Sequence, residues 1–198
     1  MALAQVHITA EIAENAKLGE GVSIWQYVHI RENVAIGANS IIGRGAYIGI
    51  GVQIGANCKI QNYALIYEPA KLEDGVFIGP SVVLTNDEYP RAINPDETLK
   101  SGTDWSPVGV TIRKGASIGA GSICVAPVEI GEWALVAAGS TVTKNVPAFA
   151  LVAGTPAKRI NWVGKAGVPL TKLSKEKFQC PKTGQLYLLT EKDKLVEE

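Results

Sequence analysis

The sequence predicts an all-β fold of stacked short strands, on two observations about its spacing. Every sixth residue from Val6 to Leu84 is a branched aliphatic, fourteen positions in a row: Val6, Ile12, Leu18, Ile24, Ile30, Ile36, Ile42, Ile48, Ile54, Ile60, Ile66, Leu72, Ile78 and Leu84. The residue two places before each is nearly always small or β-branched. Because alternate residues of a strand face the same side, both columns can point into one core. A six-residue step would scatter these aliphatics around a helix.

Glycine follows the aliphatic residue at six of these steps, at Gly19, Gly37, Gly43, Gly49, Gly55 and Gly79. We expect a turn there that needs backbone angles most residues disfavour. Each hexad is then one short strand and one corner. Hexapeptide repeats are typical of a parallel β-helix, whose stacked coils share one apolar core.

A segment without the repeat interrupts the pattern after Leu84. Residues 85–109 hold three prolines, charges of both signs and no hexad. The repeat then resumes at Ile112, Ile118, Cys124, Ile130, Val136 and Val142. Loops of this length are usually functional or disordered. Trp105 and the step Tyr89-Pro90-Arg91 favour an ordered loop that packs against other groups.

Two further segments follow the repeat. Residues 146–165 predict a cap on the last coil, so that a β-helix domain spans residues 1–165 with the loop 85–109 inserted in it. Residues 166–198 form a charged extension without hexads, in which residues 178–180 and 186–188 flank a Pro-x-x-Gly turn and predict a hairpin. The repeats make nearly seven coils, roughly 32 Å tall at the usual spacing between strands.

Composition excludes several classes of protein. The formal net charge is zero and the sequence pI is about 6.7, so no basic excess points to nucleic acid. The N-terminus lacks the pattern of a signal peptide, and no run of eighteen apolar residues occurs, so we expect a soluble cytoplasmic protein with no membrane partner. Cys58 and Cys124 occupy core columns, and the three cysteines have neither paired spacing nor a metal-ligand pattern.

Polar and aromatic residues gather in a few columns when the chain is written in rows of eighteen. These columns hold residues 25–32, Arg44, Tyr47, residues 61–63, Tyr67, Glu68, Ser81, Thr85 and Asn86, whereas the columns between are mostly small turn residues. Exposed aromatics with Arg mark subunit interfaces in general. The same side chains can also line a ligand site. The sequence leaves both interpretations open.

The hexad pattern with glycine after the aliphatic, the loop and the ending 146–164 together resemble the hexapeptide-repeat acyltransferases. Within that superfamily, the strings VSIWQYVHIREN, CKIQNYALIYEPAKLEDGVFIGPSVVLTND, YPR and KNVPAFALVAGTPAKRI are similar to bacterial N-acetyltransferases of nucleotide-linked 3-amino-glucuronates. The resemblance covers about residues 5–165. It implies a left-handed β-helix of triangular section, and a homotrimer with active sites between subunits.

The resemblance also implies the reaction. Acetyl-CoA is the expected co-substrate, without a metal, and the acceptor is the 3-amino group of UDP-2-acetamido-3-amino-2,3-dideoxyglucuronate in the synthesis of surface polysaccharide such as O-antigen. The chain has only two histidines, His7 and His29, and none in the loop. The resemblance implies that the amine attacks directly, that the CoA sulfur takes the proton, and that an amide positions the amine. Asn86 is the residue expected there, with Asp87 as the alternative if a general base exists.

Binding residues follow from the same columns. We expect Arg31 and Arg91 to meet pyrophosphate or the uronate carboxylate, because guanidinium offers a fork of donors. Gln61 and Asn62 suit hydroxyl and amide groups, and the expected substrate contacts are His29, Arg31, Gln61, Asn62, Tyr67, Asp87 and Arg91. For CoA, small residues would admit an extended pantetheine and cations would meet its phosphates: Ala120, Ala138, Lys114, Lys144, Lys158 and Arg159.

The same repeats raise three other functions. A γ-type carbonic anhydrase needs three histidines for each zinc ion, which two histidines do not supply. A non-catalytic hexapeptide scaffold is disfavoured by the long loop and by the crowded polar columns. An acyltransferase for another acceptor, such as a dTDP-linked amino sugar or a small amine or hydroxyl compound, stays open.

Overall fold

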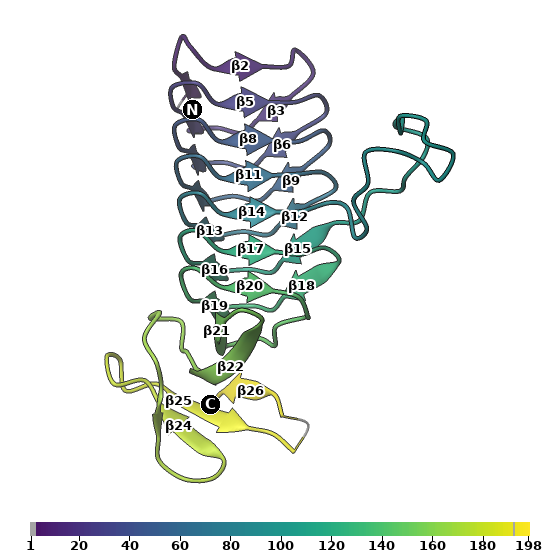
Figure 1. The fold of residues 1–198 in the computed structure, drawn as a ribbon. Helices are drawn as coiled ribbons and strands as arrows, with labels where there is room; N and C mark the ends of the chain where they lie inside the picture. Colours follow the sequence, from purple (N-terminus) through teal and green to yellow (C-terminus); the bar gives the residue numbers. More distant parts are fainter. Residues whose placement is uncertain (1–2, 192) are drawn as a thin grey trace.

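The computed structural model describes residues 3–191 and 193–198, and it is a triangular prism of short strands with a loop at mid-height and a small sheet at one end (Figure 1). Three sheets form the sides of the prism. Sheet A contains β1 (Gln5–Val6), β4 (Ser23–Ile24), β7 (Ile41–Ile42), β10 (Lys59–Ile60), β13 (Phe77–Ile78), β16 (Ser117–Ile118), β19 (Leu135–Val136), β21 (Ala150–Gly154) and β22 (Ala157–Trp162).

The other two sides repeat the same arrangement. Sheet B contains β2 (Glu11–Ile12), β5 (His29–Ile30), β8 (Tyr47–Ile48), β11 (Leu65–Ile66), β14 (Val83–Leu84), β17 (Ile123–Cys124) and β20 (Thr141–Val142). Sheet C contains β3 (Lys17–Leu18), β6 (Ala35–Ile36), β9 (Gln53–Ile54), β12 (Lys71–Leu72), β15 (Val110–Ile112) and β18 (Val128–Ile130). We name the three edges of the prism A/B, B/C and C/A after the sheets that meet there.

The coils stack in a fixed register, and the helix is left-handed. Ile24 pairs with Ile42, and Ile30 with Ile48, so each residue lies against the one eighteen positions later. In Figure 1 the strands of sheet B run from left to right on the near side while the coils descend, which is a left-handed screw. The predicted fold class, an all-β parallel β-helix with left-handed coils, is confirmed.

Both predicted columns line the core. The aliphatic column from Ile24 to Leu84 and its small partners from Val22 to Val82 are buried, apart from half-buried ends outside this span. Three serines in the small column are also buried, because each hydroxyl bonds to a neighbouring coil: the Ser40 hydroxyl donates to the Gly55 carbonyl (2.9 Å) and accepts from the Cys58 N–H (2.9 Å). All three cysteines are free and buried, and burial raises the pKa of Cys124 to about 12.

The glycines that follow the aliphatic residues are required for a different reason from the one expected. Their backbone angles are ordinary; at Gly37 an added Cβ would overlap the backbone of Gly55 and Ala56 in the next coil. The left-handed angles lie two residues further on, at Gly21, Gly45 and Gly51, and also at Tyr27 and Asn39. Close approach of stacked corners, and not turn conformation, therefore selects glycine after the aliphatic.

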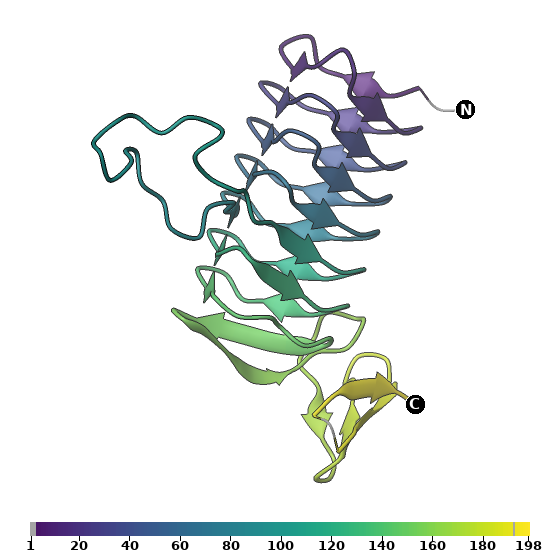
Figure 2. The ribbon, with the colours of Figure 1, turned by 90° about the vertical axis from the view of Figure 1, so that its right-hand side faces the viewer.

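The loop 85–109 leaves the prism at the B/C edge, between β14 and β15, and projects away from it (Figures 1 and 2). Leu72 pairs with Ile112 across the loop, so this coil has 40 residues (112 − 72), which is 22 more than the regular eighteen. Its two ends are joined where the Val108 N–H donates to the Asn86 carbonyl (3.0 Å). Stacking resumes below it without a change of register, since Leu84 pairs with Cys124.

The end of the chain is a four-stranded antiparallel sheet, where the sequence predicted one hairpin. Its strands are β23 (Thr171–Lys172), β24 (Lys177–Gln179), β25 (Leu186–Leu189) and β26 (Leu195–Glu197), and β24 and β25 form the predicted hairpin. Buried Tyr187 packs on Phe149 of the cap with ring centroids 5.5 Å apart, and its hydroxyl accepts from the Lys165 N–H (3.2 Å). The part of the chain that is described contains no helix long and apolar enough to cross a membrane.

We predict that Gly37→Ala lowers the free energy of unfolding by about 1–3 kcal/mol, the usual cost of overpacking a filled site. The added methyl group meets backbone atoms of the next coil, which cannot move away without breaking the ladder. Gly102→Ala is the matched control, because an added Cβ there meets nothing within 4 Å. Thermal melting of both variants checks this, and equal melting temperatures would contradict the crowding of the corners.

Candidate active site

The B/C edge carries one vertical column of mostly polar residues that crosses the base of the loop. Pairing of Ile66 with Leu84, and of Leu84 with Cys124, places the corner residues of successive coils above one another. The column that results reads, from the N-terminal end, Glu32, Ile50, Glu68, Asn86, Ala126 and Lys144. The predicted catalytic residue Asn86 therefore shares an edge with the predicted CoA contact Lys144, about 10 Å away at two coil spacings.

Hydrogen bonds of the Asn86 backbone and of its neighbour Thr85 fix the base of the loop. The Asn86 carbonyl accepts from Val108, which closes the loop, and the hydroxyl of Thr85 accepts from the Ala126 N–H of the coil below (3.0 Å). The residue is half-buried. Asp87, the alternative base, is engaged within the loop, since its Oδ1 accepts from the Tyr89 N–H (2.9 Å).

An aromatic ladder runs down the outer face of sheet B toward the same edge. His29 meets Tyr47 edge to face with centroids 5.6 Å apart, and Tyr47 lies 5.2 Å from Tyr67. Arg31 joins the ladder, because its Nη1 donates to the Tyr47 hydroxyl (3.4 Å) while its Nε pairs with Glu32 (3.0 Å). His29, Arg31 and Glu32 line a hollow of about 220 Å³. Three predicted substrate residues, His29, Arg31 and Tyr67, are thus brought together.

Gln61 and Asn62 lie on a different edge, A/B. They line a hollow of about 410 Å³ with Trp25, Ile41 and Arg44. The Asn62 side chain is partly committed, since its Oδ1 accepts from the Arg44 N–H of the coil above (3.0 Å). Ala120 and Ala138 stand in the same column as Asn62, two and three coils further along, and both are exposed.

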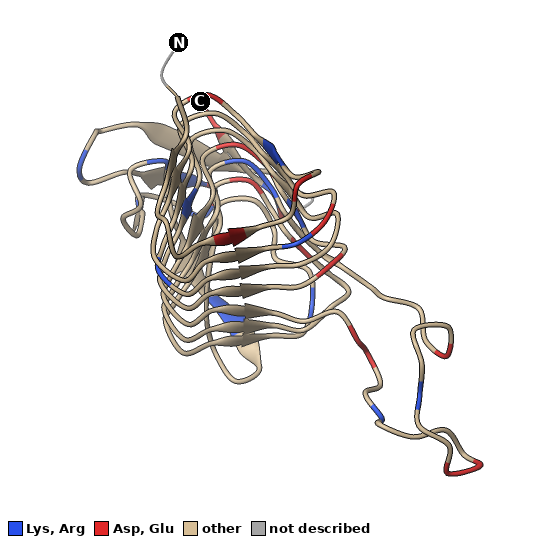
Figure 3. Cartoon of the chain, turned by 90° about the horizontal axis from the view of Figure 1, so that it is seen from above, with Lys and Arg blue, Asp and Glu red and all other residues tan. Residues whose placement is uncertain are grey.

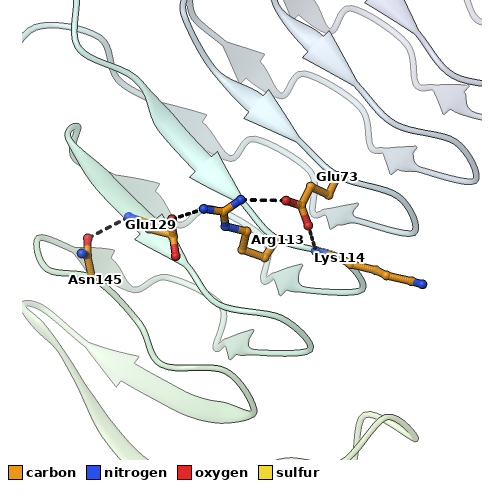
Figure 4. Close-up of polar contacts among 5 residues, drawn as sticks. All are labelled: Glu73, Arg113, Lys114, Glu129 and Asn145. Atoms are coloured by element: carbon orange, nitrogen blue, oxygen red, sulfur yellow. Dashed lines mark hydrogen bonds and ion pairs between the residues drawn. The ribbon is translucent and has the colours of Figure 1, made fainter.

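Lys114 lies on the third edge, C/A, beside a network that joins several coils (Figure 4). Arg113 donates to Glu73 through Nη1 (2.8 Å) and to Glu129 through Nη2 (2.6 Å). Glu73 also accepts from the Lys114 N–H (2.9 Å), and its hydrogen bond with Arg113 holds its pKa below the ordinary value of 4.5. The Lys114 side chain points away from this network (Figure 4).

The remaining predicted residues lie apart from these groups. Lys158 and Arg159 are on β22 at the end of the prism, where Arg159 pairs with Asp193 through two bonds (2.8 and 3.0 Å) and stacks over Trp162 (4.2 Å). Arg91 is exposed in the loop and its Nη1 donates to the Pro90 carbonyl (3.1 Å). One chain therefore spreads the predicted CoA contacts over three edges and the end of the prism.

The sequence places Tyr47 and Glu68 in the polar columns, as part of an interface or a ligand site, but predicts no specific role for either residue. Tyr47 connects His29 to Tyr67 and receives Arg31, and Glu68 stands directly above Asn86. The arrangement in rows of eighteen contained both, because Tyr47 falls under His29 and Glu68 over Asn86. Only the structure shows which neighbours the Tyr47 ring reaches and how deeply the Glu68 carboxylate is placed.

Comparison with known proteins identifies the repeats. Residues 5–49 and 51–86 match the model described as bacterial transferase hexapeptide (six repeats), and residues 109–144 match the hexapeptide repeat of succinyl-transferase. A dTDP-3-amino-3,6-dideoxy-alpha-D-galactopyranose 3-N-acetyltransferase from Aneurinibacillus thermoaerophilus is 55% identical over 47 residues, 24% of this chain and 24% of that one. Escherichia coli serine acetyltransferase is 36% identical over 85 residues, 42% of this chain and 30% of that one.

A solved structure shares the fold along most of the chain. The hexapeptide transferase family protein from Anaplasma phagocytophilum superimposes with a TM-score of 0.54 at 24% identity, covering 83% of this chain and 81% of that one. The curated relatives are matched over much less, since the matched regions span about a quarter to a third of their length. These comparisons establish the repeat and the fold.

We predict that Arg113→Gln lowers the melting temperature slightly at neutral pH and flattens its decline in acid. Glu73 has a depressed pKa in the folded protein, so its stabilising contribution is present above its ordinary pKa of 4.5 and is lost as the pH falls through the lower, folded value. Removing Arg113 removes the largest cause of that shift, while the hydrogen bond from the Lys114 N–H remains. Both groups are about 40% exposed, so the effect is small and shrinks with salt. Melting temperatures between pH 3 and pH 7 check this; identical slopes for both proteins would contradict it.

Proposed function

We propose that this chain, which belongs to the bacterial hexapeptide-repeat transferases, moves the acetyl group of acetyl-CoA to the amino group of a nucleotide-linked sugar. The observation that carries the proposal is the B/C edge, where Asn86 sits at the base of the loop beside the ladder of His29, Tyr47 and Tyr67. The relative with 55% identity over its matched segment is named for the same reaction on a dTDP-linked 3-amino sugar.

The acceptor that we propose is the 3-amino group of UDP-2-acetamido-3-amino-2,3-dideoxyglucuronate. Its carboxylate and pyrophosphate suit Arg31, which already donates into the ladder, and Arg91, which is exposed in the loop. Such a sugar would be used for surface polysaccharide, including O-antigen, and would be acetylated in the cytoplasm, where acetyl-CoA is made. His29 and Tyr67 would contact the sugar, and Asp87 would help to shape the base of the loop.

In the proposed reaction the amine nitrogen attacks the thioester carbonyl. A C–N bond forms, the C–S bond breaks, and the proton of the amine ends on the CoA sulfur. Asn86 would hold the amine in the attacking position, since positioning a reactant is worth several kcal/mol of the barrier in general. The small, exposed Ala120 and Ala138 leave room for an extended chain along the A/B edge, and Lys114, Lys144, Lys158 and Arg159 would be the cations for its phosphates.

The split of these residues between edges favours a site shared by subunits. Gln61, Asn62 and the alanines lie on edge A/B, whereas Asn86 and Lys144 lie on edge B/C of the same chain. Sheet B presents Leu65, Val83 and Ile123 outward, while sheet C presents Lys17, Gln53, Lys71 and Glu129. Figure 3 shows charged residues along that side of the prism. We propose a homotrimer that buries sheet B and the exposed aromatics Trp25, Tyr27 and Tyr63, with edge A/B of one subunit facing edge B/C of the next.

A panel of acceptors tests the reaction. The protein is mixed with acetyl-CoA and, in turn, UDP-, dTDP- and GDP-linked amino sugars and serine, and thiol release and acetylated product are followed. Serine is included because the serine acetyltransferases share repeats with this chain. The UDP-linked 3-amino-glucuronate should be the best acceptor. Transfer to serine alone would overturn the sugar assignment, and no transfer to any acceptor would overturn the proposal.

We predict that Asn86→Ala lowers kcat by about 10² or more, the usual cost of losing one oriented polar group at a reacting centre. His29→Asn should mainly raise KM or weaken assembly, because His29 lies three coils from Asn86, about 14 Å along the prism. Steady-state kinetics on both variants check this. The assignment is reversed if His29→Asn abolishes kcat in an intact assembly while Asn86→Ala stays near the unmodified rate.

We predict that the particle in solution has three times the mass of one chain, which is 21.0 kDa. Light scattering coupled to size exclusion measures the mass directly. Trp25→Glu together with Tyr63→Glu places charges in the proposed contact and should shift the particle toward the mass of a single chain. A native protein that stays monomeric at all concentrations would exclude the shared site.

A further inference from the structure

The fourth coil repeats one corner arrangement three times, once on each edge. The corner residues are Asn62, Glu68 and Asp74, and each side chain folds back onto a glycine of the coil above, Gly43, Gly49 and Gly55 respectively. An added Cβ on any of these glycines would overlap an oxygen of the side chain below. The glycines therefore leave the space that the three side chains occupy.

Two of the three side chains use that space to bind backbone. The Oδ1 of Asn62 accepts from the Arg44 N–H (3.0 Å), and the Oδ1 of Asp74 accepts from the Ala56 N–H (2.7 Å), in both cases the residue after the glycine. At the third corner the matching N–H belongs to Ile50. The Oε2 of Glu68 is buried there and has no hydrogen-bond partner within residues 3–191 and 193–198.

Corner capping does not explain Glu68. The capping geometry suits Asn or Asp, and glutamate is one methylene longer. A buried carboxylate oxygen without a donor costs free energy, so the side chain gains if a donor reaches it. Other acidic side chains on the prism do have donors: Glu73 and Glu129 share Arg113, and Glu32 pairs with Arg31.

The position of Glu68 indicates where such a donor would come from. Glu68 stands one coil above Asn86 in the same column, about 4.8 Å along the prism. The next residue, Pro69, lies against Gly109, where an added Cβ would overlap the Pro69 carbonyl, and Tyr67 ends the aromatic ladder. Glu68 as a whole is half-buried, so part of the residue is accessible from the base of the loop although its Oε2 is buried.

We propose that the Glu68 carboxylate accepts the N–H of the acceptor amine and carries its proton during acyl transfer, an inference that rests on the proposed function. As the amine nitrogen bonds to the thioester carbon and the C–S bond breaks, Glu68 takes the proton from nitrogen. It then gives the proton to the departing CoA thiolate and returns to its ionised form. Asn86 holds the amine, and the proton reaches sulfur through Glu68.

Glu68→Gln tests the proton transfer, because the amide keeps an acceptor oxygen but cannot take a proton. We expect kcat to fall by about 10² or more, within the usual range for loss of a general base, with KM changed less than threefold. Asp74→Asn is the matched control: the same change from acid to amide at the equivalent corner on edge C/A, with the capping oxygen retained. It should keep kcat within about twofold.

Glu68→Asn tests the corner separately from catalysis. Its shorter side chain should accept from the Ile50 N–H as Asn62 does from Arg44, so the melting temperature should rise by about 2–4 °C while kcat falls as in Glu68→Gln. This gain in stability is measured by thermal melting and needs no substrate. A fall in melting temperature would show that Glu68 is a structural residue, and would overturn its assignment.

The outcomes separate this inference from the proposed function. If the unmodified protein acetylates none of the acceptors, the proposed function fails and the role of Glu68 fails with it. If the unmodified protein is active and Glu68→Gln keeps kcat within threefold, the function stands and the inference is overturned. A loss of kcat in Glu68→Gln equal to that in Asp74→Asn would mean a general effect of removing charge, and would also overturn it.

Discussion

The hydrogen bonds between consecutive coils are the interaction on which the rest of this structure depends. Strands of two residues have no stability of their own, and each is held by the strands of the coils before and after it, eighteen positions away except across the loop. The Gly37 N–H bonds to the Ile54 carbonyl at 2.7 Å, and the same step recurs along the prism. Corners must therefore approach as closely as strands do, which is why glycine follows the aliphatic. The fixed register also turns each position of the repeat into a straight column.

Because the residues of one column lie above one another, the chemistry of an edge is set by side chains that are one coil apart in the sequence. The loop 85–109 lengthens one coil and leaves the columns above and below it aligned. It can do so because its two ends meet at Asn86 and Val108, so the coil continues as if the loop were absent. A long segment is thereby fixed at one height and on one edge. The residues that lie against the base of the loop are those of the B/C edge, such as Pro69 and Ala126.

The sequence was sufficient for the fold because one period encodes the core, the corners and the stacking at once. The sequence does not reveal why glycine is needed at position 37, because crowding between coils cannot be distinguished from turn conformation in the sequence alone. The strands β23 and β26 were missed because Thr171–Lys172 and Leu195–Glu197 are short and mostly exposed, so they carry little hydrophobic pattern. Size and charge predict the CoA contacts but do not fix the edge on which each side chain lies, so the predicted residues fall on different edges of one chain.

A repetitive fold also allows equivalent positions of the same coil to be compared with one another. Asn62, Glu68 and Asp74 occupy equivalent corners of one coil, so the backbone requirement at each is the same and only the side chains differ. Two of them meet that requirement and the third does not, although Asp or Asn at position 68 would meet it. Local departures from structural rules concentrate at functional sites, because there the chemistry decides the residue. The departure at Glu68 falls on the same edge, one coil from Asn86, where the repeat itself is interrupted by the loop. Two independent irregularities of an otherwise regular prism thus meet at one place, and that coincidence supports the site that we propose there more strongly than either residue does alone.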